Sequence, residues 1–468
     1  MKRCLSLIPI IALSACQGAT ADSLKSLSVE RGAKIYSEHC ESCHGVGLSG
    51  GQAPSLADDN WEYDGTDQGL LQAITDGIEE VGMPAFDEVL TSQDKQDLVA
   101  YIRSGGDLKT TAPIDTVPSV EGQVQIQDWA TGLDQPWGIH FIGTDTALVT
   151  EKSGKLLQVT SSGRFEVLGI PASVNDRQGG LMDVATDPDY TTNGWVYLSF
   201  THADEKTSKN RMTKIVRGKI SAQTLGFMWT SEQTLFQAKP EDYLNTAFHY
   251  GSRITFDNQG HLYFGIGDRG KKEMAQDLSK PNGKIHRIMR DGSIPKDNPF
   301  LDNPKAYPSI FTYGNRNPQG TIVHPETQVV WETEHGPKGG DELNVIESGV
   351  NYGWPAISYG RNYSGTVLTP YTALPGMKQP ASQWTPSIAV CGLDVYTGDL
   401  FPQWKGRLLA GSLKNQTVRL INVDRKDYLG EEILIKDEGR VRDVTTGPDG
   451  AIYVALPNRI VRLSPRSK

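Results

Sequence analysis

Two cysteines and a histidine near the amino terminus form the strongest chemical motif of the sequence. The segment Cys40-Glu41-Ser42-Cys43-His44 places two thiols three residues apart and an imidazole directly after them. Thiols at this spacing can add to the vinyl groups of haem, and the adjacent histidine can bind the iron. A zinc site would need two further ligands nearby, and a thioredoxin-type dithiol would need a βαβ context. The motif therefore predicts haem c on Cys40 and Cys43, with His44 as an iron ligand.

The sixth iron ligand should come from the opposite face of the haem. Met83, in Gly82-Met83-Pro84, is the only methionine between Cys43 and residue 123. A thioether ligand raises the reduction potential of the haem, which suits an electron acceptor. The alternative is that Met83 only fills the core and that another ligand, or none, completes the iron. His39, beside the motif, is expected to face solvent.

Helical patterns surround this motif. Ser28 can cap a helix whose apolar positions precede Cys40. A second helix is expected over residues 66–78, with leucines and isoleucines on one face. A third should start at Thr91, with Asp94 three residues on, and stop at Gly105. Residues 28–106 resemble a class I cytochrome c domain.

A second kind of chemistry is indicated by Phe311–Pro355, which contains FTYGNRNPQG, EHGPKGGDELN and GVNYGWP. Glycine lets the backbone approach a ligand closely, and a short charged run beside it suggests a bound ion or anionic group. Ordinary surface turns of a β protein are the alternative explanation for this stretch.

The chain beyond Val124 changes to a strand pattern. Units such as Ile254–Ile266 and Val444–Ala455 share an apolar strand, an Asp/Asn-Gly turn and an alternating aromatic strand. Such units recur every fifty-odd residues without helical blocks between them. This spacing predicts an all-β propeller with six blades over residues 124–468, and a pair of β-sandwiches is the structural alternative.

Nine motifs in this region occur in the order found in one known family. From about Thr131 to Leu463 the chain resembles the glucose/sorbosone dehydrogenase family, whose members use pyrroloquinoline quinone (PQQ). The motifs are RQGGLMDVATDPDY, FHYGSR, GIGDRG, GKIHRI-x-RDGSIPKDNPF, YGNRNPQG, EHGPKGGDELN, NYGWP, PSIAVCGL and GRVRDVTTGPDG. Their order and spacing resemble the membrane-linked aldose dehydrogenases more than the soluble glucose dehydrogenases.

The resemblance implies roles for individual residues. His249 would take the proton from a sugar hydroxyl, Asp268 would orient its imidazole, and Arg316 would face the quinone oxygen where charge develops. PQQ carries three carboxylates and an ortho-quinone, so its binding site needs cations and hydrogen-bonding groups. The implied PQQ-binding residues are Gln178, Asn317, Lys414, Arg440 and Arg442.

Calcium is the third cofactor that the resemblance implies. Gly336 and Pro337 match residues whose backbone carbonyls bind a calcium ion that also touches PQQ. Glu342 and Tyr352 are expected at a second, structural calcium, with Asp341 as a competing ligand.

The sequence also departs from the soluble glucose enzymes. Phe248 stands where they have an acidic residue, and Glu273 lies near a position where they have glutamine. The aromatic pair that covers PQQ there is not evident around Ser382–Ser387. These differences indicate an open site that accepts several aldoses.

Cys391 occupies a position where a small residue is usual, and we expect it to pack in the core. Arg440 and Arg442 flank Val441, as on one face of a strand.

The amino terminus predicts export. Residues 1–16 combine Lys2 and Arg3, a short apolar run and Leu-Ser-Ala-Cys, which resembles a bacterial lipobox. Lipid on Cys16 would tether the chain to the periplasmic side of a membrane, and Gln17 favours the outer membrane. An ordinary signal peptide with Cys16 as a bystander is the alternative. Cys4 would leave with the signal, Cys16 would take lipid, Cys40 and Cys43 form one motif, and Cys391 stands alone, so no pair remains for a structural disulfide.

Composition limits the partners. A net charge of −10 disfavours nucleic acid, and the 468 residues favour two or more domains. The expected division is a signal peptide over 1–16, a tether over 17–27, a cytochrome c domain over 28–106, a linker over 107–123 and a propeller over 124–468.

These observations favour an oxidoreductase acting on CH–OH groups, a quinohaemoprotein that converts aldoses to lactones and passes electrons from PQQ to haem c. A downstream acceptor of the respiratory chain would then take the electrons. Two alternatives stay open on the sequence. One is a calcium-dependent lactonase-type propeller with a separate haem domain, and the other is a carbohydrate-binding propeller with a haem sensor.

Overall fold

The computed structural model describes residues 21–45, 48, 53–54, 56, 64–104, 118–204, 206, 209–224 and 226–466. The chain divides into two compact units. The first comprises Met1–Ile78 and Met83–Thr111, and the second comprises Glu79–Gly82 and Ala112–Lys468. Within the described residues, no helix combines the length and the apolar character that crossing a membrane requires.

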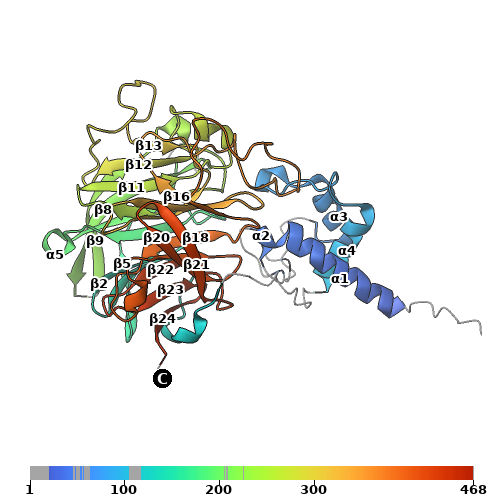
Figure 1. Ribbon diagram of the computed structural model, residues 1–468, viewed down its shortest axis with the longest axis horizontal. Helices are drawn as coiled ribbons and strands as arrows, with labels where there is room; N and C mark the ends of the chain where they lie inside the picture. The colour runs from blue at the N-terminus through green and yellow to red at the C-terminus, as the bar shows by residue number, and fades with distance from the viewer. Residues whose placement is uncertain are drawn as a thin grey trace, which may run out of the picture. The chain divides into compact units, whose positions relative to one another are not determined.

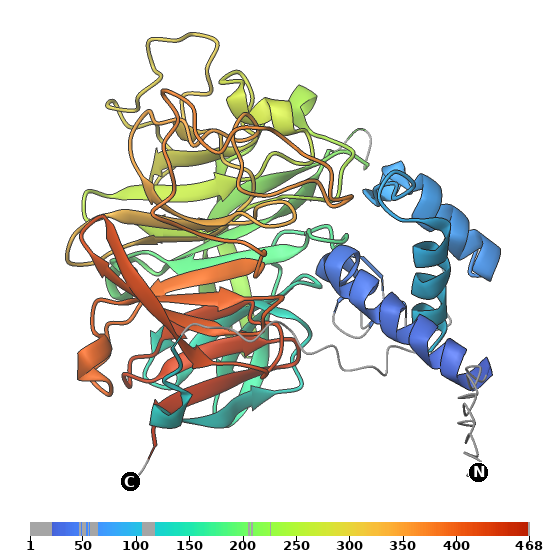
Figure 2. The ribbon, with the colours of Figure 1, turned by 45° about the vertical axis from the view of Figure 1, so that its right-hand side comes forward.

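The first unit is helical. Its helices are α1 (Ala21–His39), α2 (Glu41–His44), α3 (Asp67–Asp76) and α4 (Ser92–Arg103), and the short 3-10 helix η2 (Glu79–Val81) lies between α3 and α4 in the chain. In Figure 2, α1 (dark blue) crosses α4 (teal), and the two helices lie close together at Gly32. A Cβ at Gly32 would lie 2.0 Å from the carbonyl oxygen of Asp97, so only glycine permits this contact.

Two of the three expected helix starts hold. Thr66 caps α3, and Thr91 forms a capping box with Asp94 at the start of α4. Ser28 does not cap a helix, because α1 begins at Ala21 and places Ser28 in its interior. Its hydroxyl donates instead to Asp97, which also accepts a 2.6 Å bond from Arg31. The expected stop at Gly105 lies outside the described residues.

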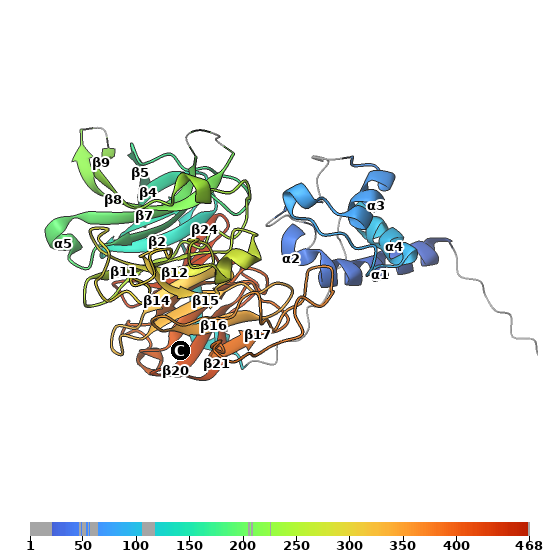
Figure 3. The ribbon, with the colours of Figure 1, turned by 90° about the horizontal axis from the view of Figure 1, so that it is seen from above.

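The second unit consists of sheets whose strands pair antiparallel, with one exception described below (Figure 1). Three have four strands and strictly sequential order: β10 (Ile254–Phe256), β11 (His261–Ile266), β12 (Lys284–Met289), β13 (Ile310–Tyr313); β14 (Pro318–Val323), β15 (Val330–Glu334), β16 (Asp341–Ile346), β17 (Ser382–Trp384); and β18 (Val390–Val395), β19 (Leu408–Ser412), β20 (Val418–Asp424), β21 (Asp427–Ile435). Figure 3 shows β14, β15 and β16 side by side.

The largest sheet joins two groups of four strands. Its strands are β2 (Pro136–Gly143), β3 (Thr146–Glu151), β4 (Lys155–Thr160), β5 (Gly163–Leu168), β6 (Leu181–Thr186), β7 (Trp195–Ala203), β8 (Arg211–Gln223) and β9 (Gly226–Phe236). The groups β2–β5 and β6–β9 are each antiparallel, and one parallel pairing of β5 with β9 joins them.

The last sheet combines both ends of the second unit. It has the order β1 (Val124–Thr131), β24 (Arg459–Pro465), β23 (Ile452–Leu456) and β22 (Asp443–Thr446). Because the first strand completes a sheet made by the last three, the mostly β arrangement is nearly closed and propeller-like. Short helices lie in the connections: η3 (Glu121–Gln123), α5 (Tyr190–Asn193), η4 (Pro240–Asp242), η5 (Lys272–Gln276) and η6 (Pro402–Trp404).

Buried charges connect neighbouring sheets. Arg253 forms ion pairs with Asp183 at 2.9 Å and Asp443 at 3.0 Å. The same carboxylates accept backbone N–H groups of Ile254, at 2.8 Å, and Ile139, at 2.9 Å. We call Arg253, Asp183 and Asp443 the Arg253 hub. It fixes β2, β6, β10 and β22 relative to one another, because its bonds join four different groups of strands.

Candidate active site

The topology gathers the candidate residues of the second unit at one edge of the sheets. Some lie just before the first strand of a group, namely Gln178 before β6, His249 before β10, Arg316 and Asn317 before β14, and Arg440 and Arg442 before β22. Others lie just after a second strand, namely Asp268 after β11, His335 after β15 and Lys414 after β19. Since the first two strands of each group are antiparallel, the start of one and the end of the next share an edge.

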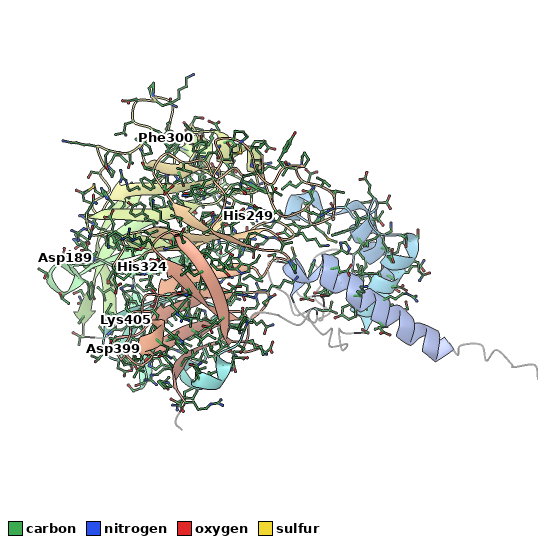
Figure 4. All side chains as sticks on the ribbon, in the orientation of Figure 1. Asp189, His249, Phe300, His324, Asp399 and Lys405 are labelled. Carbon is green, nitrogen blue, oxygen red and sulfur yellow. The ribbon has the colours of Figure 1, made fainter. Side chains whose placement is uncertain are left out.

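His249 is held in an unusual backbone conformation. Its φ of +53° lies in the left-handed region, which costs a side-chain-bearing residue about 1 kcal/mol. Its backbone N–H donates to Gln178 Oε1 at 2.8 Å. A Cβ at Gly267 would lie 2.4 Å from the carbonyl oxygen of His249, so glycine there lets the two segments approach. Figure 4 labels His249 in the second unit.

The imidazole of His249 pairs with a buried carboxylate. Its Nδ1 lies 2.6 Å from Asp268 Oδ1, and the His249 side chain is 13% exposed. Burial lowers the pKa of His249, Asp268 opposes this, and Arg316 lowers the pKa further. Burial alone would raise the pKa of Asp268, but His249 and further hydrogen bonds bring it below its usual value. The pair is therefore a neutral imidazole and a carboxylate, with the proton on Nδ1 and the lone pair on Nε2.

Other histidines of this unit have structural roles. His324, also labelled in Figure 4, accepts backbone N–H groups of Glu326 and Thr327 at Nδ1 and bonds the carbonyl of Gly406 through Nε2 at 3.0 Å. His286 is fully buried between Ser309 and Pro281. Only His249 combines a left-handed backbone, a buried carboxylate partner and partial exposure among these three.

Arg316 lies beside the His249–Asp268 pair. The backbone N–H of Asp268 donates to the carbonyl of Arg316 at 2.8 Å. The guanidinium is 5% exposed and donates through one nitrogen to the carbonyls of His335, at 2.8 Å, and Gly336, at 2.7 Å. Its Nε is buried without a partner. Asn317 follows, with its Oδ1 close to Gly267.

The expected PQQ-binding cations lie on two neighbouring segments. The backbone N–H of Val441 donates to Ser412 at 3.1 Å, which joins the turn of Lys414 to the segment of Arg440 and Arg442. The expectation that these arginines lie within a strand is wrong, because β22 starts at Asp443. The alternation still holds, since Val441 is buried and both arginines are half-buried.

Cys391 is fully buried, in line with a packing role. Arg442 also donates to its Sγ at 3.5 Å. Lys152, which the sequence motifs did not single out, is close enough to Arg442 for the two cations to interact, and burial together with Arg442 lowers its pKa.

His335 is a site residue that the sequence analysis missed. Burial lowers its pKa, and so do Arg316, Arg442 and His249, which places the imidazole among these three groups. Its Nε2 is buried without a partner. The available signal was its position next to Gly336 in the EHGP motif.

The residues present fit a polyanionic quinone. Arg316 Nε and His335 Nε2 are buried polar atoms that the protein leaves without partners, and unpaired groups of this kind cost free energy unless a ligand satisfies them. They lie among cations that include Arg442. The carbonyl of Gly336, beside Arg316, is a suitable ligand for a hard cation such as calcium. A Cβ at Gly336 would lie 2.2 Å from the carbonyl of Gly340, so the turn requires glycine.

Three buried glutamates lie next to this site. The side-chain amide of Asn344 faces Glu332 at 3.1 Å, Glu342 at 3.2 Å and Glu334 at 3.5 Å. Burial and mutual repulsion raise the pKa of Glu332 and Glu334 well above the usual value, and burial raises that of Glu342 to about 7. We call these four residues the glutamate cluster. Among the described residues, no lysine or arginine forms an ion pair with its carboxylates.

The hydroxyl of Tyr352 is already used in two hydrogen bonds within the protein. It donates to the carbonyl of Val345 and accepts the backbone N–H of Glu347 at 3.0 Å. Only its backbone oxygen is therefore a candidate ligand. In the described part of the chain, no group of three or more His, Cys, Asp or Glu side chains is arranged to hold a metal ion. A second calcium at Glu342 and Tyr352 stays a prediction.

The haem motif of the first unit lies on α2. Cys40 is the N-cap residue, and Cys43 and His44 are within the helix. His44 Nδ1 lies 2.9 Å from the carbonyl of Pro54, which places the proton on Nδ1 and the lone pair on Nε2, the atom suited to iron. Met83 forms an isolated bridge with Ile78 and packs half-buried against the helical core.

The expectation that His39 faces solvent is wrong. Its side chain is only 13% exposed and meets the ring of Phe86 edge-on, with ring centroids 5.9 Å apart. The ring packs against Phe86 instead of extending into water.

Comparisons with known proteins match each unit to a family model. Residues 133–463 match glucose / sorbosone dehydrogenase, and residues 28–102 match cytochrome c oxidase, cbb3-type, subunit III. Aldose sugar dehydrogenase YliI of Escherichia coli (strain K12) is 35% identical over 344 residues, which cover 72% of this chain and 91% of that protein. Quinoprotein glucose dehydrogenase B of Acinetobacter calcoaceticus is 27% identical over 411 residues, covering 70% and 84%. The crystal structure of the soluble aldose sugar dehydrogenase from Escherichia coli in the apo-form superposes with a TM-score of 0.69 and 34% identity, covering 73% of this chain and all (100%) of that one.

Proposed function

The chain belongs to the glucose/sorbosone dehydrogenase family and carries an N-terminal cytochrome c domain, and we propose from this premise that it is a quinohaemoprotein. Its proposed reaction is the oxidation of an aldose at the anomeric carbon to the lactone. The observation that carries the proposal is the 2.6 Å contact of His249 with buried Asp268, beside the guanidinium of Arg316.

The side chains divide the work of this reaction. His249 Nε2 accepts the proton of the anomeric hydroxyl, and Asp268 stabilises the imidazolium that results. Arg316 stabilises negative charge that develops on the acceptor oxygen. When bound, PQQ supplies the hydride acceptor and haem c the one-electron acceptor. The left-handed backbone of His249 and its bond to Gln178 hold the base in place before the substrate arrives.

The same proposal assigns the cofactor-holding residues. The PQQ carboxylates and ring oxygens would meet Gln178, Asn317, Lys414, Arg440 and Arg442. The carbonyls of Gly336 and Pro337 would hold one calcium ion, and Glu342 with the backbone oxygen of Tyr352 a second. Counting β2–β5 and β6–β9 as separate groups, we infer six blades of four strands for the propeller.

We assign haem c to the first unit, with Cys40 and Cys43 bound covalently and His44 and Met83 as iron ligands. The tautomer of His44 supports this assignment. Carrying donor and acceptor on one chain makes electron transfer intramolecular, with a high effective concentration. A respiratory-chain acceptor would reoxidise the haem.

We further propose that the protein is exported and anchored by lipid on Cys16 at the periplasmic side of a bacterial membrane. Labelling cells with a radioactive fatty acid tests this, since wild type should incorporate label and Cys16→Ser should not. Equal labelling of both proteins would contradict lipidation at this position.

Haem reduction tests the enzymatic proposal. The oxidised full chain, supplied with PQQ, calcium and a panel of aldoses, should show the absorption change of reduced haem. His249→Gln should slow this reduction by about 10²–10⁴-fold while PQQ still binds, because only the base is lost. If the haem stays oxidised with every sugar, while dithionite reduces it, the proposal fails. Hydrolysis of sugar lactones without PQQ would favour the lactonase alternative instead.

A further inference from the structure

One indole ring contacts both halves of the proposed catalytic cluster. Trp354 Nε1 donates to Asp268 Oδ2 at 2.8 Å, on the carboxylate whose other oxygen meets His249. The guanidinium carbon of Arg316 lies 5.1 Å from the centroid of the Trp354 ring. Trp354 is 8% exposed. Its N–H and its ring therefore serve two different groups at once.

The backbone of Trp354 is fixed on both sides. Its N–H donates to the carbonyl of Gly314 at 2.9 Å, two residues before Arg316. Its carbonyl accepts Gln276 Nε2 at 2.6 Å, and Gln276 also bonds Asn351. These bonds involve only the backbone of Trp354, and they direct its indole toward Asp268. The loop therefore fixes the position of the ring, and the ring can in turn orient Asp268 and Arg316.

Asp268 uses both carboxylate oxygens. Oδ1 accepts from His249 and from the backbone N–H of Gly270 at 2.7 Å, and Oδ2 accepts from Trp354. Without the indole N–H, the carboxylate could pivot about Oδ1 and would carry more charge facing the imidazole. The tryptophan side chain combines an N–H donor with a flat ring that a guanidinium can face.

We propose that Trp354 is a positioning residue that sets the charge and orientation of Asp268 through its N–H and the orientation of Arg316 through its ring. The proposal rests on the proposed function, in which His249 is the base and Arg316 faces the quinone. Trp354 itself touches neither substrate nor cofactor in this assignment.

Two substitutions separate the two contacts. Trp354→Phe keeps a ring beside Arg316 and removes the donor to Asp268. Trp354→Gln keeps an N–H of similar reach and removes the ring. The full chain of each variant is first compared with wild type by thermal melting, to establish that the second unit is folded.

The first measurement is the pKa of His249 in the chain without PQQ, followed by NMR of isotope-labelled histidine. The charged and titratable groups that act on this imidazole are Asp268, Arg316, Arg269 and His335. In Trp354→Phe the carboxylate loses a donor, so we expect a rise of about half a pKa unit, or threefold in proton affinity. Trp354→Gln should stay close to wild type. An unchanged pKa in the Phe variant, or an equal change in both, overturns the role of the N–H.

The second measurement is the dissociation constant of PQQ in the presence of calcium. Losing the ring contact in Trp354→Gln should weaken binding about threefold to tenfold, whereas Trp354→Phe should bind nearly as wild type. Equal affinities in wild type and the Gln variant overturn the role of the ring.

A measurement on the unaltered protein covers the case in which a variant does not fold. The indole N–H resonance of Trp354 should shift with the same pH midpoint as the ring of His249, because both report the charge next to Asp268. A resonance that does not follow this midpoint contradicts the proposal. The NMR measurements use no PQQ and no sugar, so they keep their meaning even if sugars fail to reduce the haem.

Discussion

The Arg253 hub and the glutamate cluster are both buried groups of charge in the same unit, but their balance differs. In the hub, one guanidinium serves two carboxylates and also donates to the backbone carbonyls of Gln319, Trp137 and Arg442. In the glutamate cluster, all three carboxylates face the single side-chain amide of Asn344, and Glu334 also accepts the backbone N–H groups of Arg316 and Asn317. Glu332 Oε1 and Asn344 Oδ1 have no partner.

The difference separates a group whose charges balance from one whose charges do not. A buried charge is tolerated when it is paired and hydrogen-bonded, as Arg253 is. Three carboxylates without a cation either bind protons or bind a metal ion. The hub is satisfied by its own side chains. The glutamate cluster has no cationic side chain, so its carboxylates take up protons or a cation, and the calcium that the family resemblance implies at Glu342 is the prediction tested below.

Removing the cation should destroy the balance of the hub. Arg253→Met leaves Asp183 and Asp443 buried together without a counter-charge, and we expect a loss of about 3–5 kcal/mol in the free energy of unfolding. Urea unfolding followed by tryptophan fluorescence measures this, since eight of the nine tryptophans follow residue 112. Adding Asp183→Asn and Asp443→Asn to the variant should restore much of the loss. A single-variant loss below about 1 kcal/mol would mean that the hub is not a structural centre.

Calcium should stabilise the protein through the glutamate cluster and leave the Arg253 hub unaffected. At a concentration 100 times its dissociation constant, calcium should raise the unfolding free energy by about 2.7 kcal/mol. Glu332→Gln should stabilise the calcium-free protein, because it relieves repulsion among the carboxylates, and should reduce the gain from calcium. Urea titrations with calcium and with EGTA give both values.

Glu347→Gln is the matched control for that experiment. Glu347 is an acidic residue near Tyr352, but it already forms ion pairs with Lys378 and Lys426. Its substitution should leave the calcium-dependent gain unchanged. If Glu347→Gln and Glu332→Gln lower the gain equally, the effect is one of overall charge and the glutamate cluster holds no ion.

Much of the site could be anticipated from short motifs. His249, Asp268 and Arg316 belong to segments that end or begin strands, so once the strands form, these segments meet at one edge. The haem motif is likewise local, since Cys40 and His44 lie within one turn of α2 and its start. Capping of α4 by Thr91 depends only on Asp94 three residues away.

The features that the sequence did not predict depend on contacts between segments that are far apart in the chain. Glu332 and Glu342 read as ordinary alternating residues of two strands until the register β15–β16 brings them to one amide. The Trp354 indole is 86 residues from Asp268 in the chain. Ser28 was misassigned for a similar reason, because its partner Asp97 lies on another helix. Patterns of local spacing carry no information on such pairs.

A third buried group is neutral and has no counter-charge, so it extends the comparison of the Arg253 hub with the glutamate cluster. His286 is fully buried and stacked on Phe264, and burial lowers its pKa to about 3. In the unfolded chain its pKa is about 6.5. The unfolded state therefore binds a proton below pH 6.5 that the folded state refuses, so stability is complete above pH 6.5 and falls as the pH drops toward 3.

The slope that His286 contributes is at most about 1.4 kcal/mol per pH unit. His286→Gln keeps a donor and an acceptor but cannot titrate, so its unfolding free energy should depend on pH less steeply between pH 6 and 4. His140, whose pKa burial lowers to about 4, should keep part of the slope. Because only slopes are compared, a general loss of stability in the variant does not affect the result. Equal slopes in wild type and His286→Gln would show that His286 gains a proton inside the folded protein. His286 would then resemble the glutamate cluster, whose buried groups also take up protons.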